Sequence, residues 1–370
     1  MKILHIASFV GNIGDNASHI GFQNLLADCV KNVTISQMEM RKFYKNYQGQ
    51  DRLNFDQNFI DYANTFDRVV IGGGGFLDYC IKDSQSGTTI DMCPTLLSSL
   101  KVPTWLTSVG CAPHHPVPAE NKQKFRSFLD ACLDNKMIRI NVRNDGSIMA
   151  LREDIGPQYA AAVTEILDHG FFFQPLSSDN LPLNNYIAVN ISQDQIRMQR
   201  RSGQAIDPEN YYQNLAKSLN EIIANTNKHL VLIPHIYSDL AAITSLLSKM
   251  NDFEVRSRVT VAPCIQELAG ANFIFNLYRH ADLIIGMRFH ANVCGLAMAR
   301  PTIGLQALDR VGYMFGHLGL ANRTVLVEDD FSKNLIEMAL DSLKKPLFYA
   351  QTGSLDKQKQ LTLSHYKQFF

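Results

Sequence analysis

The 370-residue sequence has no excess of charge, no long apolar run and no closely spaced pair of cysteines. Its 35 Lys and Arg residues balance 35 Asp and Glu residues, so composition offers no basic face for a nucleic acid. No apolar stretch approaches the ~18 residues needed to span a bilayer. The N-terminal apolar run is interrupted by His5 and Ser8, which is atypical of a signal peptide. We therefore expect neither a nucleic-acid partner nor a membrane-spanning segment.

The seven cysteines are odd in number and include no C-x-x-C pair. In a chain of this length, that pattern favours free thiols in a reducing cytoplasm over a disulfide framework. His114 and His115 are adjacent, but no third metal ligand lies at a suitable spacing. The sequence therefore predicts a cytoplasmic protein with no metal and no bound cofactor.

Short segments rich in Val and Ile alternate with helix-length segments along the chain, which predicts parallel sheets with helices on both faces. The alternation stops at 170–185, a stretch rich in Pro, Ser, Asn and Asp that is typical of a linker. We expect strands at 3–9, 33–38, 68–71, 104–109 and 138–142, and again at 186–191, 230–234, 259–261, 283–285, 302–305 and 324–327.

The same pattern predicts two Rossmann-like, doubly wound α/β domains, at 1–175 and 185–345. A helical tail at 346–370 is expected to pack back on the first domain. Helices are expected between the strands, one of them at 89–100. Ligands of such sheets bind beyond the carboxyl ends of the strands, and with two domains the natural site is the cleft between them.

The motif "FVGNIGDNA", residues 9–17, follows the first expected strand. Gly11 and Gly14 permit a tight turn into a helix, and Asp15 or Asn16 can cap that helix. The N–H groups of a helix N-terminus can face an anion or a sugar hydroxyl. An ordinary glycine turn with an Asp cap explains the motif equally well.

The motif "VVIGGGGFLDY", residues 69–79, places four glycines at the end of another strand. A structural turn needs one or two, so four indicate a backbone that a ligand approaches closely. Asp78 is then either an acceptor for a ligand hydroxyl or a helix cap. The Lys-Ser/Thr pair of a phosphate-binding Walker loop is missing.

The motif "INVRNDGS", residues 140–147, ends a strand with Arg143. Arginine binds carboxylates and phosphates through paired hydrogen bonds. The alternative is a surface arginine that pairs with Asp145, as most arginines lie at the surface.

The stretch "LIIGMRFHANVCGLAMARPTIGL", residues 283–305, places Arg288 and His290 just past a strand and before a helix of small residues. A guanidinium, an imidazole and a helix N-terminus then converge, which favours an anion site with a proton donor beside it. A core histidine bonded to a carbonyl is the alternative. His235, in "IPHIYSD", and Arg310, in "LQALDRVGY", follow further strands as weaker candidates.

Taken together and in this order, the motifs resemble those of the polysaccharide pyruvyltransferase family over roughly residues 3–320. The resemblance implies a fold similar to GT-B glycosyltransferases. The implied activity is transfer of pyruvate from phosphoenolpyruvate to a sugar of a cell-surface polysaccharide, such as an exopolysaccharide, capsule or cell-wall polymer, or to its lipid-linked precursor. The product is usually a cyclic ketal.

The resemblance also assigns roles to residues. It implies that Arg288 and His290 meet the donor. We hypothesise that His290 donates a proton, either to the donor or to the departing phosphate, and that Asp15 contacts or deprotonates the acceptor. Further donor-binding candidates are Arg143, His235 and Arg310. Acceptor-binding candidates are Gly11, Asn12, Gly14, Gly73, Gly74 and Asp78.

Two other functions remain open from the sequence. A GT-B glycosyltransferase with a sugar-nucleotide donor would share the fold and would place an acidic residue, such as Glu328 or Asp329, on the ribose. A non-catalytic glycan-binding or assembly protein would have no need of Arg288 beside His290. The C-terminal stretch 355–370 also leaves peripheral contact with the inner face of a membrane open, and self-association of the chain is open as well.

Overall fold

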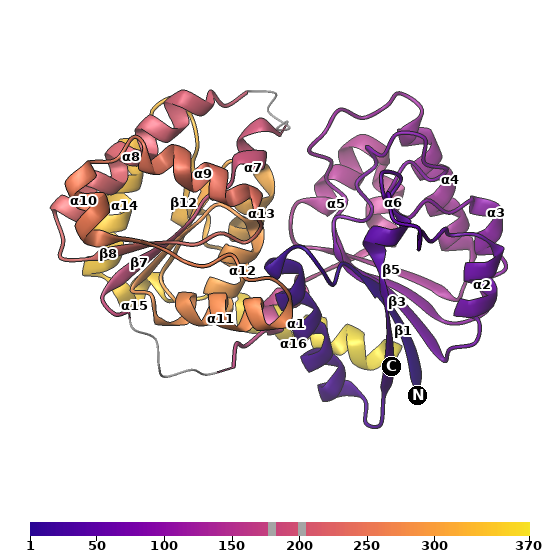
Figure 1. Cartoon of the computed structure of the whole chain (residues 1–370). Helices are drawn as coiled ribbons and strands as arrows, with labels where there is room; N and C mark the ends of the chain where they lie inside the picture. Colours follow the sequence, from indigo (N-terminus) through magenta and orange to yellow (C-terminus); the bar gives the residue numbers. More distant parts are fainter. Residues whose placement is uncertain (177–182, 199–204) are drawn as a thin grey trace. The chain divides into compact units, whose positions relative to one another are not determined.

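The computed structural model describes residues 1–176, 183–198 and 205–370, which form two compact units (Figure 1). Residues 177–182 of the expected linker lie outside the described residues. Unit 1 comprises Met1–Phe9, Phe22–His169 and Gln358–Phe370, and unit 2 comprises Val10–Gly21 and Gly170–Lys357. A single boundary near residue 175 therefore does not describe the division, because unit 2 includes the start of the first helix.

Unit 1 is built on a six-stranded parallel sheet in the order β2-β1-β3-β4-β5-β6. Its strands are β1 (Lys2–Ala7), β2 (Thr34–Glu39), β3 (Arg68–Gly74), β4 (Thr104–Val109), β5 (Ile138–Arg143) and β6 (Thr164–Ile166). The helices are α1 (Ile13–Cys29, shared with unit 2), η1 (Met40–Phe43), α2 (Gln57–Ala63), α3 (Pro94–Leu97), α4 (Asn121–Asp134), α5 (Ser147–Ala150), η2 (Leu151–Ile155), α6 (Pro157–Ala162), η3 (His169–Phe172, at the junction of the units) and α16 (Leu355–Phe369).

The helix expected at 89–100 is wrong, because only the short helix α3 forms there. The preceding residues fold into turns in which side-chain hydroxyls bond the backbone. Ser84 Oγ donates to Thr88 O at 2.7 Å, and Ser86 Oγ donates to Ile90 O at 2.7 Å. Such local bonds offer the backbone an alternative to a helix.

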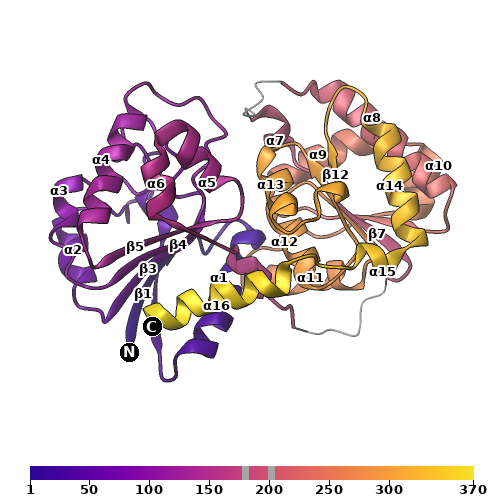
Figure 2. The ribbon, with the colours of Figure 1, turned by 180° about the vertical axis from the view of Figure 1, so that it is seen from behind.

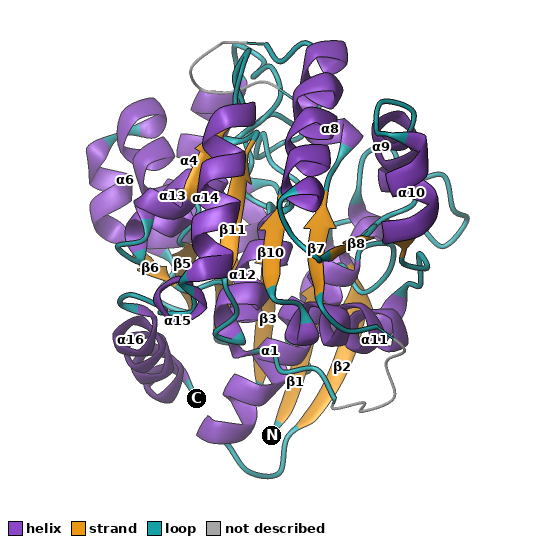
Figure 3. Ribbon diagram, turned by 90° about the vertical axis from the view of Figure 1, so that its left-hand side faces the viewer, coloured by secondary structure: helices purple, strands orange, loops and turns teal. Residues whose placement is uncertain are grey.

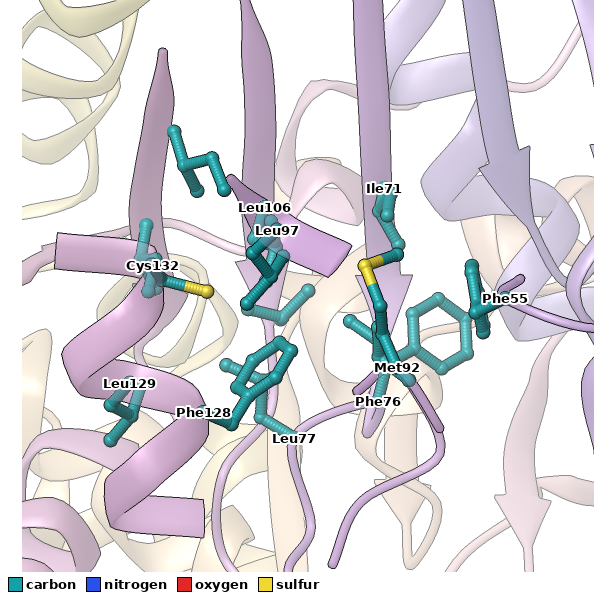
Figure 4. Close-up of a cluster of buried hydrophobic side chains, with 14 of the residues drawn as sticks. Phe55, Ile71, Phe76, Leu77, Met92, Leu97, Leu106, Phe128, Leu129 and Cys132 are labelled. Carbon is teal, nitrogen blue, oxygen red and sulfur yellow. The ribbon is translucent and has the colours of Figure 1, made fainter. Parts of the chain in front are cut away.

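One face of the unit 1 sheet carries a large apolar core, part of which is shown in Figure 4. Leu106 and Ile71, on neighbouring strands, lie in one cluster with Phe128 and Leu129 of α4, and Ile71 lies near Met92. Period-2 alternation sends successive strand residues to opposite faces, so this core uses only every second strand residue.

The C-terminal residues pack on unit 1 (Figure 2). The Tyr366 ring of α16 lies 4.5 Å from Trp105, centroid to centroid, and its hydroxyl is 3.1 Å from Thr107 Oγ1. Thr362 Oγ1 accepts a hydrogen bond from Leu167 N at 3.1 Å. Burial raises the pKa of Tyr366, so the residue stays a neutral hydrogen-bonding group.

Unit 2 repeats the architecture with the strand order β12-β11-β10-β7-β8-β9, again parallel (Figure 3). The strands are β7 (Tyr186–Asn190), β8 (His229–Leu232), β9 (Val259–Val261), β10 (Leu283–Gly286), β11 (Thr302–Gln306) and β12 (Thr324–Leu326). The helices are α7 (Gln193–Arg197), α8 (Pro208–Ala224), α9 (Ser238–Leu247), α10 (Asp252–Arg258), α11 (Glu267–His280), α12 (Phe289–Ala297), α13 (Asp309–His317), η4 (Ala321–Arg323), α14 (Ser332–Lys344) and α15 (Pro346–Tyr349).

Both faces of the unit 2 sheet are covered by helices. Ile187 and Val189 of β7 pack in one core with α8, α9 and α14. Ala188, on the opposite face, packs in a second core with α11, α12 and the first turns of α1, which contribute Ile13 and Ala17. The start of the chain's first helix is therefore part of the unit 2 core. Among the helices of the described residues, none combines the length and apolarity required to cross a membrane.

The four-glycine run at the end of β3 has a packing role. A Cβ on Gly72 would lie 2.0 Å from Thr107 O in the neighbouring strand, and a Cβ on Gly74 would lie 2.6 Å from the Phe76 ring. Gly73 has a φ of 80°, in the left-handed region that favours glycine. The spacing of the chain around this strand end thus accounts for three of the four glycines without a ligand.

We predict that Gly72→Ala destabilises the protein by about 3 kcal/mol or more, because the methyl group meets backbone of the adjacent strand. Urea unfolding measures the change. Gly316→Ala is the control, since nothing lies within 4 Å of its added Cβ and alanine favours the helix by up to ~1 kcal/mol. Equal stabilities for the two variants would contradict the packing role.

Candidate functional site

Arg288 lies between β10 and α12 and is held by two carboxylates. Its Nε donates to Asp239 Oδ2 at 2.7 Å and its Nη2 to Asp239 Oδ1 at 2.5 Å. Nη2 also donates to Asp194 Oδ1 at 3.1 Å. Arg288 is 8% exposed and Asp239 is fully buried. No described residue accepts a hydrogen bond from Nη1, so this edge of the guanidinium is available to a ligand.

The charges of the cluster stabilise one another. Burial would lower the pKa of Arg288, but the hydrogen bonds and charges of Asp239 and Asp194 outweigh burial and raise it. Burial would raise the pKa of Asp194, but Arg288 and Ser192 outweigh it and hold the pKa below its usual value. Arg288 and Asp194 are therefore both ionised at neutral pH. The positive charge of Arg288 is balanced by the carboxylates that bind it.

Two buried asparagines fix the backbone on either side of Arg288. Asn190 Oδ1 accepts from Arg288 N at 2.9 Å, while Asn190 Nδ2 donates to Ile233 O at 2.9 Å. Asn292 Nδ2 donates to Gly286 O at 2.9 Å and to Arg288 O at 3.1 Å. The ends of β7, β8 and β10 are thereby tied to the first turn of α12, where the N–H groups of a helix N-terminus favour an anion.

His290, in the first turn of α12, lies against the glycine turn that opens α1. It is 6% exposed, and a Cβ on Gly14 would lie 2.6 Å from its Nδ1. Asn12 Oδ1 accepts from Gly14 N at 2.9 Å, and Gly11 has a φ of 85°. Asp15, half-buried, follows in the first turn of α1.

The structure therefore brings the first and the fourth sequence motifs together within unit 2. The sequence analysis assigned Gly11, Asn12 and Gly14 to an acceptor side in the first domain, apart from the donor residues. Gly14 instead touches His290, because the apolar first turns of α1 belong to the core of unit 2.

His235 lies behind this cluster. Its ring is fully buried, and its Nε2 is 2.9 Å from the Tyr278 hydroxyl. Its backbone N–H donates to Asp239 Oδ2 at 2.9 Å. Burial, with the charges of Arg288 and His290, lowers the pKa of His235 well below its usual value. The ring therefore pairs with Tyr278 inside the core, and its contact with a donor stays a prediction.

Arg310, in the first turn of α13, borders the cluster. Gln195 is 1% exposed, and in the amide orientation that satisfies both neighbours it donates to Met287 O at 3.2 Å and accepts from Arg310 Nη2 at 3.1 Å. Gln195 and Met287 are the chain neighbours of Asp194 and Arg288. Gln195 therefore links Arg310 to Met287, the residue before Arg288.

Arg143 belongs to unit 1 and is engaged by carboxylates. Its Nε donates to Asp145 Oδ2 at 2.6 Å, and its Nη1 donates to Asp168 Oδ2 at 3.5 Å. The guanidinium is buried rather than at the surface. The pairing with Asp145 considered from the sequence is present. In the same unit, Asp78 Oδ1 accepts from Ala112 N at 2.9 Å.

Sequence reasoning missed Asp194, Asn190 and Asn292, and Asp239 entered it only as the last residue of the motif "IPHIYSD". A short polar residue at the end of an apolar strand, as in "IAVN", is the signal that could have indicated Asn190. Within the ranges that the structure describes, no group of three or more His, Cys, Asp or Glu side chains is arranged to hold a metal ion.

We predict that His235 makes the protein acid-sensitive. Its pKa is lower in the folded state than the ~6.5 of an unfolded chain, so the unfolded state gains a proton first as pH falls. Stability is then lost below about pH 6.5, by up to about 1.4 kcal/mol per pH unit.

Urea unfolding at pH 7 and pH 5 tests this sensitivity. The loss in the wild type should exceed the loss in His235→Gln by about 1–2 kcal/mol. His229→Gln, at an exposed position of β8, should behave like the wild type. Identical losses in all three proteins would contradict the assignment.

Among curated proteins, no sequence matches the chain significantly. Solved structures match over nearly the whole chain at low identity. The UDP-GlcNAc 2-epimerases of Neisseria meningitidis (TM-score 0.52, 14% identity) and Methanocaldococcus jannaschii (TM-score 0.53, 14% identity) each cover 99% of this chain and 100% of their own. A trehalose-phosphate synthase from Burkholderia vietnamiensis (TM-score 0.53, 10% identity) covers 100% of this chain and 95% of its own.

These likenesses show the fold alone, a two-domain, GT-B-like α/β architecture with a parallel sheet in each unit. A family model described as polysaccharide pyruvyl transferase matches residues 12–306. That range runs from the glycine turn of α1 through Arg288 and His290 to the end of β11. The chain belongs to the polysaccharide pyruvyl transferase family.

Proposed function

We propose that this protein transfers pyruvate from phosphoenolpyruvate to hydroxyl groups of a saccharide destined for a cell-surface glycan, forming a ketal. The observation that carries the proposal is the grouping of Arg288 and His290 at the N-terminus of α12, against the glycine turn of α1. The family match supports the same activity.

Phosphoenolpyruvate carries a carboxylate and a phosphate on one small molecule, so its site needs several anion-binding groups. Nη1 of Arg288 and the first N–H groups of α12 supply them here. Because Asp239 accepts hydrogen bonds from Nε and Nη2, the Nη1 edge of the guanidinium is held in place before the donor binds. Arg310 offers a second guanidinium beside Gln195.

Asp194 competes with the donor in this arrangement. Its carboxylate occupies Nη2 of Arg288, and its side chain is 34% exposed, against none for Asp239. A donor phosphate that binds Arg288 meets a like charge there, which is unfavourable. We infer that the phosphate takes the place of Asp194 at Nη2.

Ketal formation requires a proton at the methylene carbon of phosphoenolpyruvate, which makes the neighbouring carbon electrophilic. A sugar hydroxyl attacks that carbon, the C–O bond to phosphate breaks, and a second hydroxyl closes the ring. Of the two hydroxyl protons released, one balances the proton added to the methylene and the other leaves with phosphate. General acid–base groups typically contribute ~10²–10⁴ in rate to such steps.

We assign the acid to His290 and the base to Asp15. Gly14 touches the His290 ring, and Asp15 is the next residue of the same helix turn. His290 donates either to the methylene carbon or to the departing phosphate. Acid and base then come from two helices whose first turns are packed in one core.

A sugar-nucleotide donor would need Glu328 or Asp329 beside its ribose, and the described residues leave little room there. The cavity that they line after β12 has a volume of about 10 Å³, room for about one water molecule. The proposal therefore keeps phosphoenolpyruvate as donor. We keep the expectation from the sequence that the protein is cytoplasmic and acts on an exopolysaccharide, capsule or cell-wall precursor. Contact with a membrane and self-association are further expectations.

We predict that His290→Ala lowers the phosphoenolpyruvate-dependent release of phosphate in the presence of acceptor by 10²-fold or more, because the acid is lost. His280→Ala, at an exposed position of α11, should retain wild-type turnover. Thermal unfolding must show that both variants are folded. Retention of more than about a tenth of the wild-type rate by His290→Ala would reject the acid role.

We predict that Asp194→Asn tightens phosphoenolpyruvate binding, because it removes the carboxylate that competes for Arg288 while an amide oxygen can still accept from Nη2. Calorimetry should give a dissociation constant about tenfold lower than that of the wild type, equivalent to about 1.4 kcal/mol. Weaker binding by Asp194→Asn would show instead that Asp194 supports the bound donor.

A further inference from the structure

Leu347 in α15 is 87% exposed, the largest exposed fraction among the large hydrophobic side chains of the described residues. Its neighbour Phe348 is 45% exposed, and Pro346 before them is exposed as well. The segment directly follows the end of α14 (Figure 2). Neighbouring exposed apolar side chains, unlike single ones, indicate an interaction surface. We call residues 344–348, with the sequence KKPLF, the α15 tip.

Arg323 holds the α15 tip in its shape. It is 2% exposed, and its Nη2 donates to Phe348 O at 2.7 Å. Its Nη1 donates to Tyr349 O at 2.8 Å and to Gln351 O at 2.5 Å. The guanidinium carbon also lies 5.4 Å from the centre of the Phe348 ring. Because one buried side chain satisfies the carbonyls that end α15, the exposure of Leu347 is a property of a well-packed element.

Two lysines lie beside the exposed apolar side chains. Lys344 is exposed, and no described residue forms an ion pair with it. Lys345 Nζ lies 2.7 Å from Asp341 Oδ1, with 62% and 39% of the two side chains exposed. An exposed pair of this kind contributes little and is screened by salt. Lys345 can therefore exchange Asp341 for another anion at small cost.

The charge around the α15 tip is positive on balance. Among the described residues, Arg323 donates hydrogen bonds to carbonyls and to no carboxylate. The two lysines of the tip and Arg323 therefore outnumber Asp341 by three charges to one. The other charged residues of α14 and of the first turn of α16 cancel in number, with Lys333 and Lys357 against Glu337 and Asp356.

The C-terminal stretch 355–370, which the sequence left open for membrane contact, is a less suitable surface. Leu355, Tyr366 and Phe369 of α16 are 1%, 0% and 8% exposed. Leu361 is 47% exposed, but the residues one turn before and after it in the helix are polar. Packing therefore takes up most of the apolar surface of α16, whereas that of the α15 tip is open to solvent.

A lipid surface with anionic headgroups fits the α15 tip. A side chain as exposed as Leu347 projects from the protein and can enter a fluid phase without a matching groove. Transfer of one such side chain out of water favours binding by roughly ten- to hundredfold. Each lysine near an anionic membrane surface adds about fivefold, an effect that salt weakens. A few such groups give reversible, peripheral binding.

We propose that the α15 tip binds reversibly to an anionic lipid surface. Leu347 and the exposed edge of Phe348 enter the boundary between headgroups and acyl chains, and Lys344 and Lys345 meet the headgroup phosphates. That this contact brings the protein to a lipid-linked acceptor rests on the proposed pyruvyl transfer, whereas the binding itself does not.

A fluorescent reporter at the α15 tip tests the insertion. Trp105 is the single tryptophan of the chain and is 1% exposed, so Leu347→Trp adds an indole with a distinct environment. Its emission should shift to shorter wavelength with vesicles of phosphatidylcholine and phosphatidylglycerol. Leu133→Trp, at a position of α4 that is 41% exposed, should show no shift. Absence of a shift for Leu347→Trp, or an equal shift for both variants, would overturn the proposal.

Cosedimentation of the full chain with the same vesicles measures the affinity. The wild type should bind them at least tenfold more tightly than vesicles of phosphatidylcholine alone. Leu347→Asp should weaken binding at least tenfold and Lys344→Ala about fivefold, while Leu133→Asp should bind like the wild type. Unchanged binding by Leu347→Asp would contradict the assignment to the α15 tip.

Sedimentation velocity without vesicles distinguishes a lipid surface from a second copy of the chain. Self-association that Leu347→Asp abolishes, with no binding to vesicles, would show that a second copy covers the α15 tip and would overturn the proposal. All these measurements omit phosphoenolpyruvate and acceptor. Their failure therefore leaves the proposed pyruvyl transfer standing, and failure of transfer to a water-soluble acceptor leaves the lipid binding standing.

Discussion

The paired hydrogen bonds from Arg288 to Asp239 hold the candidate site together. Both side chains are buried or nearly so, and removal of one partner from a buried ion pair typically costs 3–5 kcal/mol, because the other charge is left uncompensated. Asp239 is in turn bound by backbone N–H groups after β8, and Arg288 by Asn190 at the end of β7. Three strand ends are thereby locked to the first turn of α12, and the position of His290 follows from that turn.

The absence of a side chain at Gly14 is the second constraint. With any Cβ at this position, the ring of His290 would have to move, since the two would lie 2.6 Å apart. The turn that opens α1 is therefore shaped to admit the imidazole, and Asp15 follows from the same turn. In physical terms, the acid and base of the proposed reaction are held by packing between two helices that are remote in sequence.

Much of the fold follows from the sequence, because buried parallel strands leave a clear apolar pattern. The bounds expected at 104–109 and 259–261 agree with β4 and β9. The three-residue β6 was missed because Glu165 interrupts its β-branched residues, whereas β9, of the same length, consists of β-branched residues alone. The helix expected at 89–100 begins only at Pro94, because serine hydroxyls bond the backbone of Thr88 and Ile90 in turns just before it. Arg288 and His290 were found because polar groups in an apolar stretch require partners.

Partners themselves are harder to predict. Asp194 and Asp239 meet Arg288 because β7, β8 and β10 are neighbours in an order that differs from the sequence. The contact of Gly14 with His290 depends on which unit the first turns of α1 join, and amphipathic spacing does not encode that choice. The glycines of β3 were assigned to a ligand because the sequence does not show which strand lies beside them. The structure places Thr107 of the adjacent strand against Gly72.

A crystal structure of the chain with phosphoenolpyruvate tests the central claim most directly. We expect an oxygen of the donor at about 3 Å from Nη1 of Arg288, with the donor's remaining atoms beside the His290 ring. Phosphoenolpyruvate bound away from Arg288, with His290 still packed on Gly14 and no donor atom near it, would contradict the account.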